Sequence, residues 1–305
     1  MNSFAATIFS LLFLLTTSNT SLQAQQIALT FDDAPMRSGY FSGSARTDTL
    51  LTALKNAGVE QVAFFVVTSR LNAAGTARIE LYAQAGHIIA NHSHRHQSMR
   101  RIGVPNYIDD IFIADSLLRG FAGYNPWYRY PFLDEGRTRS ARDAIRAALT
   151  GNGYQNAYVT IDNYDWILDA LFVEGHRTGR KIDFEQLKAL YIEHLWNSVQ
   201  FYDGLSREVL GRSVRHVLLL HENDLAALFI DDFVYFVRRQ GWGIISPIDA
   251  YQDAIATIVP DVLLNNQGRV AAIAKAQGYT GPLSQQSEDR NYLEKKFNQL
   301  IFDQN

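Results

Sequence analysis

The chain has 305 residues, of which 47% are hydrophobic and 12% aromatic, and this composition excludes a largely disordered protein. Its 31 acidic and 28 basic residues give a formal net charge of −3, so there is no electrostatic reason to expect nucleic acid as a partner. The sequence contains no cysteine, which rules out disulfides, thiolate zinc sites and thiol nucleophiles.

The first 24 residues differ from the rest of the chain. Residues 8–15 form an apolar run of signal-peptide length, followed by polar residues and by Leu22-Gln23-Ala24, a suitable cleavage site. The start carries no Lys or Arg, so an uncleaved anchor or a buried terminal helix is the alternative. No later segment is apolar enough to cross a membrane. We therefore expect a signal peptide over residues 1–24 and an exported, periplasmic or secreted protein without a stable membrane anchor after cleavage.

Short β-rich runs alternate with helix-length segments after this leader. The sequence predicts strands at residues 27–31, 62–67, 87–90, 127–130, 157–161, 216–220 and 243–245. It predicts helices at residues 47–57, 71–85, 106–121, 138–150, 184–202, 225–239 and 248–258. Several strands are continuously apolar, which is typical of parallel strands buried on both faces.

This alternation predicts an α/β fold with a parallel sheet, either closed as an incomplete barrel or open and doubly wound. No linker rich in Pro, Gly or Ser divides the chain, and no internal repeat is visible. We expect one domain over residues 25–260 and a helical C-terminal extension over residues 261–305. The extension is expected to cover the outer wall of the sheet.

The first predicted strand runs into two adjacent carboxylates, Asp32 and Asp33, before Pro35. Like charges side by side are costly unless something positive lies near them. His92 and His96, four residues apart, are expected on one side of a helical turn. One Asp with two His is a usual ligand set for a zinc that keeps a position open, and the other Asp would be free to act as a base. Taken alone, Asp-Asp after a strand is more often a helix cap or a turn.

Further polar residues follow other predicted strands. Arg129 ends the fourth strand, Asp162, Asp165 and Trp166 follow the fifth, and His221 ends the sixth. Singly, such residues are usually hydrogen-bonding or salt-bridge partners with a structural role. Their convergence on one edge of the sheet favours an active site, because parallel α/β enzymes place theirs at the carboxyl ends of strands.

From about residue 27 to residue 246 the chain resembles the polysaccharide deacetylases of carbohydrate esterase family 4, which share the NodB homology domain. The resemblance implies a distorted (β/α)7 barrel and the metal-dependent removal of N-acetyl groups from an amino-sugar-containing glycan. Five motifs carry it, in the order of the family: Thr30-Phe31-Asp32-Asp33, His92-Ser93-x-x-His96, Arg129-x-Pro131-Phe132, Asp162-x-x-Asp165-Trp166 and Leu219-x-His221.

The resemblance also implies a role for each motif residue. Asp33, His92 and His96 match the ligands of a divalent metal, with zinc as the expected ion. Asp32 matches the general base that takes a proton from the attacking water. Arg129 resembles the residue that holds this base in place and keeps it ionised.

The same resemblance assigns the groups that act on the acetyl group and the amine. The backbone N–H of Phe132 would stabilise the oxyanion. His221 matches the acid that protonates the departing amine, and Asp165 matches the carboxylate that orients it. Leu219 and Trp166 would form the walls of a small pocket for the acetyl methyl group.

Three positions depart from the family pattern. Ala34 stands where Gly is common, Phe132 replaces the commoner Tyr, and an insertion over residues 168–183 precedes a helix expected to begin after Asp183. This insertion and residues 36–44 are candidate lips of a substrate groove, or else surface decoration. Two other functions compete with the deacetylase: hydrolysis of a non-sugar amide on the same barrel, and glycan binding without catalysis. The sequence specifies neither the glycan nor the oligomeric state.

Overall fold

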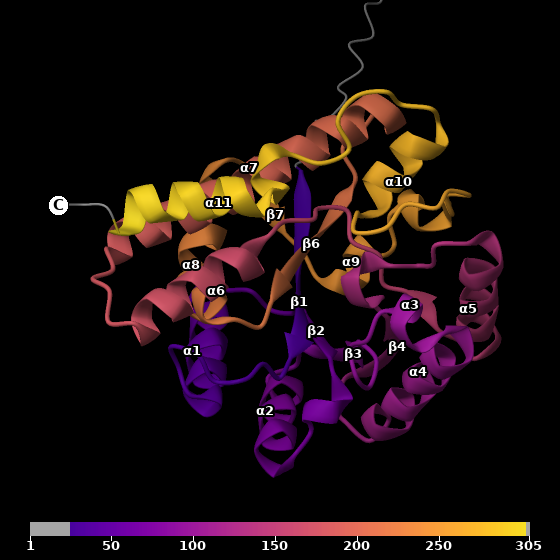
Figure 1. Ribbon diagram of the computed structural model, residues 1–305, viewed down its shortest axis with the longest axis horizontal. Coiled ribbons are helices and arrows are strands. Elements are labelled where there is room, and N and C mark those ends of the chain that lie inside the picture. The colour runs from indigo at the N-terminus through magenta and orange to yellow at the C-terminus, as the bar shows by residue number, and fades with distance from the viewer. Residues whose placement is uncertain (1–24, 303–305) are drawn as a thin grey trace, which may run out of the picture.

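The computed structural model describes residues 25–302, and the expected signal peptide lies outside them. A curled seven-stranded parallel sheet occupies the centre, with helices around it (Figure 1). Hydrogen-bonded neighbours follow the order β5-β4-β3-β2-β1-β6, and β7 pairs with β1. The strands are β1 (Gln26–Ala34), β2 (Ala63–Val66), β3 (Ile88–Asn91), β4 (Tyr124–Tyr128), β5 (Gln155–Asn156), β6 (Arg215–His221) and β7 (Gly243–Ile244). The predicted α/β fold with parallel strands is confirmed.

The sheet curls into a distorted, incompletely closed barrel because one segment links its two edges irregularly. The two residues of β5 pair with β4, and further along the same segment Ile161 forms a single parallel bridge with Leu218 of β6. The prediction of a regular strand at residues 157–161 was therefore wrong in extent. Thr160 explains the irregularity, since its hydroxyl accepts the N–H of Val217, a backbone group that a regular neighbouring strand would bind.

Helices cover the outside of the sheet. They are α1 (Gly43–Asn56), α2 (Ala73–Gln84), α3 (Met99–Ile102), α4 (Val104–Leu118), α5 (Arg139–Gly151), α6 (Asp165–Arg177), α7 (Phe184–Leu210), α8 (Asp224–Arg239), α9 (Pro247–Ala250), α10 (Arg269–Ala276) and α11 (Arg290–Phe297). Polar side chains cap several of them: Asp183 accepts the N–H groups of Glu185 and Gln186 at the start of α7, which begins after Asp183 as expected.

Two predictions of helical structure need correction. The helix expected at residues 248–258 is the short α9 followed by a 3₁₀ turn over Ala254–Thr257, because Asp253 caps that turn by accepting the N–H of Ile255. The segment expected as an insertion is mostly helical: α6 begins at Asp165 and buries Leu168 and Phe172 in the core. Its inner face is therefore part of the core rather than a free lip.

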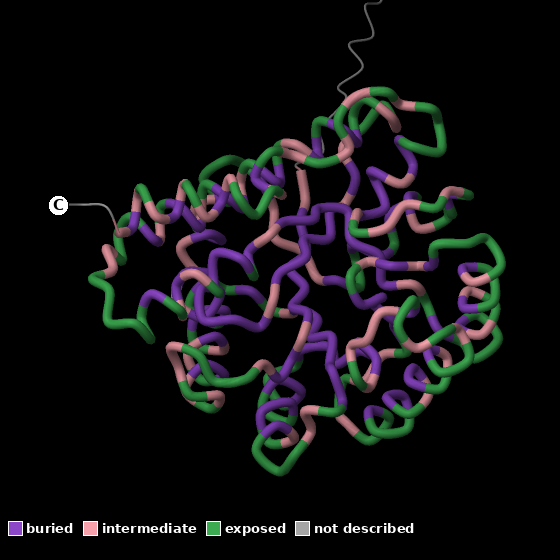
Figure 2. Tube along the Cα trace, in the orientation of Figure 1, coloured by how far each residue is buried: buried purple, intermediate pink, exposed green. Residues whose placement is uncertain are grey.

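Burial follows the layers of the fold (Figure 2). The central strands are buried on both faces, and the continuously apolar β2 is buried at all four positions. In the C-terminal segment, α10 packs against α7 and α11 packs against α6, as Figure 1 shows. Leu293 and Phe297 of α11 are buried in that contact. The expected helices of the extension are thus present, and a domain boundary at residue 260 stays a prediction.

Within residues 25–302, none of the helices combines the length and the apolar character needed to span a bilayer.

Candidate active site

A cavity of about 570 Å³ opens at the carboxyl ends of the strands. Eight of the ten predicted site residues line it: Asp32, Asp33, His92, His96, Phe132, Trp166, Leu219 and His221. The other two, Arg129 and Asp165, are hydrogen-bonded to Asp32 and His221 respectively. The structure therefore brings together all ten residues, which come from five separate parts of the chain.

Both aspartates reach the cavity because β1 is irregular at its end. Asp32 pairs in register with His221 of β6, while the register between β1 and β2 shifts between Phe31 and Ala34. In a regular strand, neighbouring side chains point to opposite faces. Asp33 escapes this alternation with a backbone φ of 69°, an uncommon value for a residue other than glycine. The irregularity places two successive carboxylates in one site.

The two histidines lie in a loop, so the prediction that they share a helical turn was wrong. Ser93 and His96 have φ values of 71° and 52°, which no right-handed helical turn contains. Side chains hold this loop instead of helical hydrogen bonds. Asn91 Oδ1 accepts the N–H of Ser93 at 2.8 Å, and Ser93 Oγ accepts the N–H of His96 at 2.9 Å.

Asp33, His92 and His96 form a cluster whose ligand atoms all lie within 4.8 Å of one another. His92 Nδ1 lies 2.8 Å from the carbonyl oxygen of Arg129, so it carries the proton and leaves Nε2 with a free lone pair. Asp33 Oδ1 is buried and has no hydrogen-bond partner among the described residues. An orphaned carboxylate oxygen beside two imidazoles fits a divalent metal site.

The protonation states of these three side chains also suit metal binding. Burial lowers the pKa of His92 and of His96 to about 4, so both imidazoles are neutral at pH 7. Burial opposes ionisation of Asp33, but the neighbouring His96, His92 and Arg70 outweigh it and lower its pKa to about 2. Neutral imidazoles and an ionised carboxylate are the forms that bind metals.

Arg70 is a neighbour of this cluster that sequence reasoning missed. It lies at the end of the 3₁₀ turn after β2, where it donates to the backbone carbonyl oxygen of Asp33 at 2.5 Å. Its Nη2 is 3.5 Å from Asp33 Oδ1. Arg70 thereby holds Asp33 in its unusual backbone conformation, and no motif or strand end marked it in the sequence.

Asp32 is buried and ion-paired. Its Oδ1 accepts a hydrogen bond from Arg129 Nη1 at 2.9 Å, and its Oδ2 lies 3.8 Å from His92 Nε2. Burial raises the pKa of Asp32 above its ordinary value, and the charge of Arg129 limits that rise. The carboxylate is therefore a stronger base than an exposed aspartate.

Arg129 is fixed on every side. Its guanidinium lies 4.2 Å from the centre of the Phe65 ring, and its Nη2 donates to Thr30 Oγ1 at 3.3 Å and to the Tyr251 hydroxyl at 3.2 Å. Its Nε donates to the carbonyl oxygen of Ala157. A side chain held this way cannot swing away from its carboxylate partner, so it fixes the position of that carboxylate.

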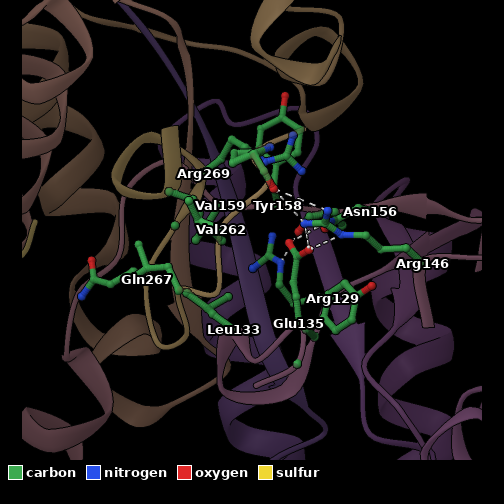
Figure 3. A pocket seen from close by; sticks show the side chains of 17 residues that line it. Arg129, Leu133, Glu135, Arg146, Asn156, Tyr158, Val159, Val262, Gln267 and Arg269 are labelled. Carbon is green, nitrogen blue, oxygen red and sulfur yellow. Dashed lines mark hydrogen bonds and ion pairs between the residues drawn. The ribbon is translucent and has the colours of Figure 1, made fainter. Parts of the chain in front are cut away.

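A second, smaller cavity of about 40 Å³ lies beyond Arg129 (Figure 3). There Glu135 accepts from Arg146 at 2.6 Å and from Asn156 at 2.9 Å, as the dashed lines in Figure 3 show. Its volume leaves room for only a few water molecules. Because its principal charged groups already pair with one another, the larger cavity is the candidate reaction site.

His221 lies opposite Asp32 and is held by Asp165. Its Nδ1 is 2.6 Å from Asp165 Oδ1, and its backbone N–H donates to Asp165 Oδ2 at 2.9 Å. Asn223 Nδ2 donates to the same Oδ2 at 3.0 Å. Burial disfavours a charged imidazole, but Asp165 dominates and raises the pKa of His221 to about 9. His221 is therefore protonated at neutral pH and has a proton to give.

Apolar side chains form the walls around these polar groups. Leu219 is 5% exposed, whereas the rings of Trp166 and Phe132 are 38% and 50% exposed to solvent. The Phe132 ring packs edge-on against the His96 ring at 4.6 Å between centroids. Large aromatic side chains left this open at a cavity mouth are typical of binding sites.

Two ion-paired side chains form hydrogen bonds with the backbone of the loop after β1. Met36, which lines the cavity, donates its N–H to Glu222 at 2.6 Å, and its carbonyl oxygen accepts from Arg78 at 2.7 Å. Arg78 and Glu222 form a buried ion pair at 2.6 Å, and Arg46 and Asp224 form another at 2.7 Å. Residues 36–44, expected as a candidate lip, are thus anchored at their start.

The C-terminal segment supplies part of the cavity wall, which sequence reasoning also missed. Asn266, with a φ of 59°, lines the cavity although it lies beyond the predicted domain end. Arg290, at the start of α11, has its guanidinium 5.1 Å from the centre of the Trp166 ring. Nothing in the local sequence indicates either contact, because both depend on how the segment packs.

Comparisons with known proteins agree with this geometry. Residues 19–157 match the family model described as polysaccharide deacetylase. The peptidoglycan-N-acetylglucosamine deacetylase of Bacillus cereus is 25% identical over 141 residues, which are 46% of each protein. The chain thus spans about half the length of the curated relative that it matches.

Solved structures with the same fold include three of different kinds. A variant of the peptidoglycan deacetylase PdaC from Bacillus subtilis has a TM-score of 0.51 at 18% identity and covers 75% of this chain and 91% of its own. A family 4 carbohydrate esterase from Streptomyces lividans, in complex with acetate, has a TM-score of 0.50 at 21% identity. The match covers 78% of this chain and 98% of the esterase chain. A family 4 pseudoenzyme from Bacillus anthracis has a TM-score of 0.51 at 12% identity. The match covers 75% of this chain and 66% of the pseudoenzyme chain.

The pseudoenzyme shows that this fold occurs without activity, so the structural likeness concerns the fold alone. The family model matches the part of the chain that carries the aspartate pair, the two histidines and Arg129. The chain is therefore similar to polysaccharide deacetylases over residues 19–157, and it shares its fold with family 4 carbohydrate esterases.

Proposed function

We propose that the protein is a metal-dependent hydrolase that removes N-acetyl groups from an amino-sugar-containing polysaccharide or oligosaccharide. The observation that carries the proposal is the arrangement around the ligand cluster. Asp33, His92 and His96 lie between a base held by an arginine and an acid held by a carboxylate, in one cavity. A protein that only binds glycans needs neither the base nor the acid.

The metal would be held by Asp33, His92 and His96, and zinc is the expected ion, although this donor set also accepts other divalent ions. When bound, a divalent metal lowers the pKa of a water molecule and polarises a carbonyl oxygen, which amide hydrolysis at neutral pH requires.

The residues of the chain carry the proton transfers. Asp32 takes a proton from the water that attacks the acetyl carbonyl carbon, and Arg129 keeps the Asp32 carboxylate in place. His221 gives its proton to the amide nitrogen as the C–N bond breaks, so acetate and a free amine leave. Asp165 holds the His221 imidazole in the protonated form that this step needs.

The remaining residues position the acetyl group. The backbone N–H of Phe132 would donate to the oxyanion that forms from the carbonyl oxygen. Leu219 and Trp166 would enclose the methyl group, since one is buried and the other borders the open mouth of the cavity. The product glycan keeps a primary amine at the position where it carried the acetyl group.

The experiment that tests the proposal measures bound metal and released acetate together. Purified protein is analysed for metals and then assayed on defined N-acetylated oligosaccharides before chelation, after chelation and after zinc is restored. We expect acetate release that chelation abolishes and zinc restores. Full activity in metal-free protein would refute the mechanism, and hydrolysis of non-sugar amides alone would favour the alternative substrate class.

We also propose that the protein acts outside the cytoplasm, because residues 8–15 resemble the apolar core of a signal peptide. Mass spectrometry of the native protein should find its N-terminus near Gln25. An intact Met1 in a cytoplasmic fraction would contradict export and would remove extracytoplasmic glycans from the candidate substrates.

A further inference from the structure

Asp162 is a buried acid in the cavity wall to which the proposed mechanism gives no role. It is 6% exposed and lines the 570 Å³ cavity beside Tyr164 and Trp166. Its Oδ1 accepts the N–H of Asn163 at 2.8 Å. Its Oδ2 accepts no hydrogen bond, and the side chain forms no ion pair, within the part of the chain that the structure describes. A buried carboxylate with a free oxygen normally has a positive partner.

A second carboxylate, Glu288, lies close enough to Asp162 to influence its ionisation. Glu288 belongs to the 3₁₀ turn Gln286–Glu288 of the C-terminal segment, and among residues 25–302 only neutral groups donate to it. These are the Tyr202 hydroxyl at 2.8 Å, Gln267 Nε2 at 2.9 Å and the N–H of Gln285 at 3.2 Å. Burial raises the pKa of Asp162 well above its ordinary value, and Glu288 raises it further. This wall of the cavity therefore favours either a proton or a cation.

The cations near this wall already have other partners. His221 faces Asp162 but is bound to Asp165 at 2.6 Å. The Arg290 guanidinium lies over the Trp166 ring and donates to Glu294 at 3.2 Å. The Asp162 carboxyl is thus available to a ligand, and a cationic group that binds there would take the place of the proton.

We propose that Asp162, in the wall of the cavity, binds the primary ammonium group of an amino-sugar unit that has already lost its acetyl group. The inference rests on the proposed function, because deacetylation produces this group on the glycan itself. The aromatic faces of Tyr164 and Trp166, whose centroids are 5.7 Å apart, suit a sugar ring and a cation. A cavity of this volume accommodates more than the reacting unit. The preferred substrate is therefore a partly deacetylated glycan, in which a free amine lies next to the unit that reacts.

Equilibrium binding tests the subsite without turnover. The full-length, metal-loaded protein and its Asp162→Asn variant are titrated by calorimetry with a glucosamine disaccharide and with the corresponding N-acetylglucosamine disaccharide. We expect the variant to bind the amine-bearing disaccharide roughly tenfold more weakly, as loss of one charge-assisted hydrogen bond implies, and the acetylated one unchanged. Asp261→Asn is the matched control, since it removes one charge from a residue that is 67% exposed and lies outside the cavity lining.

Further measurements keep the result unambiguous. Glu288→Gln should weaken amine binding less than Asp162→Asn, and higher salt should reduce the preference for the amine. Thermal unfolding of each variant shows whether it is folded. An equal loss of affinity for both disaccharides in Asp162→Asn would show that Asp162 only accepts a hydrogen bond from a hydroxyl group. Binding of Ca²⁺ that Asp162→Asn abolishes would assign the carboxylates to a metal site. Either result would overturn the proposal.

The two proposals fail in different ways. Acetate release without a preference for the amine-bearing disaccharide would refute the subsite alone. A preference for the amine that depends on Asp162, in a protein that releases no acetate, would refute the deacetylase and leave an amino-sugar-binding site.

Discussion

Asp165→Asn should shift the pH dependence of catalysis, because Asp165 controls the charge of His221. The carboxylate accepts from the His221 imidazole at 2.6 Å and from its backbone N–H at 2.9 Å. Asparagine has nearly the same shape but carries no charge. The variant therefore removes the largest of the interactions that raise the pKa of His221 to about 9, while Asp33 and Asp32 continue to raise this pKa and burial continues to lower it.

The size of the effect follows from this pKa. With a pKa of about 9, roughly 90% of His221 is protonated at pH 8; if the pKa returns to the ordinary value of about 6.5, only ~3% is protonated. If His221 is the acid, kcat should fall ~30-fold at pH 8 from protonation alone. At pH 6 most of the imidazole stays protonated in both proteins, so the same substitution should have little effect through charge.

The assay is acetate release from one defined oligosaccharide between pH 5.5 and 9.5, with thermal unfolding recorded at each pH. Asp169→Asn is the control for structural damage, since Asp169 also accepts two backbone N–H groups, from Asp224 and Leu225, but does not contact His221. We expect the alkaline limb of the profile to move by about two pH units in Asp165→Asn only. An equal loss of activity at pH 6 and pH 8 would refute the role of Asp165 in holding the proton on His221.

Three further predictions follow from the site. Asp33→Asn should lose bound metal, whereas Asp32→Asn should keep it and lose roughly 10²–10⁴-fold in kcat; identical metal contents, measured by elemental analysis, would contradict this division of roles. The pKa of His221 is higher in the folded than in the unfolded protein, so its contribution to the stability of metal-free protein is complete below pH 6.5 and is lost as the pH rises to about 9. The free energy of unfolding measured in urea should therefore decrease by at most about 3 kcal/mol over that range. Glu222→Gln should cost about 3–5 kcal/mol in the same assay because it leaves Arg78 buried without its charged partner, and a loss below about 1 kcal/mol would argue against that pair as an anchor of the loop after β1.

Local patterns in the sequence were enough to identify the fold class and the candidate residues. The apolar runs that became β1, β2 and β6 must be buried on both faces, which only a covered parallel sheet allows. Polar residues at the ends of such strands must then meet at one edge, and this is why residues as distant in sequence as Asp32 and His221 were expected together. The start of α7 after Asp183 was also expected from the local sequence.

Tertiary packing decided the features that local patterns do not encode. His92 and His96 have helical spacing, but loop hydrogen bonds from Asn91 and Ser93 replace the helix. The bend that turns both Asp32 and Asp33 into the cavity depends on the shift of register against β2. Such pairings join segments far apart in the chain, and no local propensity specifies them.

The C-terminal segment illustrates the same division most clearly. Its helices were expected from periodicity, and α11 forms where the sequence is amphipathic. That Asn266 would line the cavity, and that Glu288 would lie close to Asp162, depends on where the segment docks. Helix formation is governed by neighbouring residues, whereas docking is governed by surfaces that exist only after the barrel has folded. The sequence alone therefore determined which candidate residues lie at the strand ends, and the tertiary structure determined the shape and charge of the wall beside them.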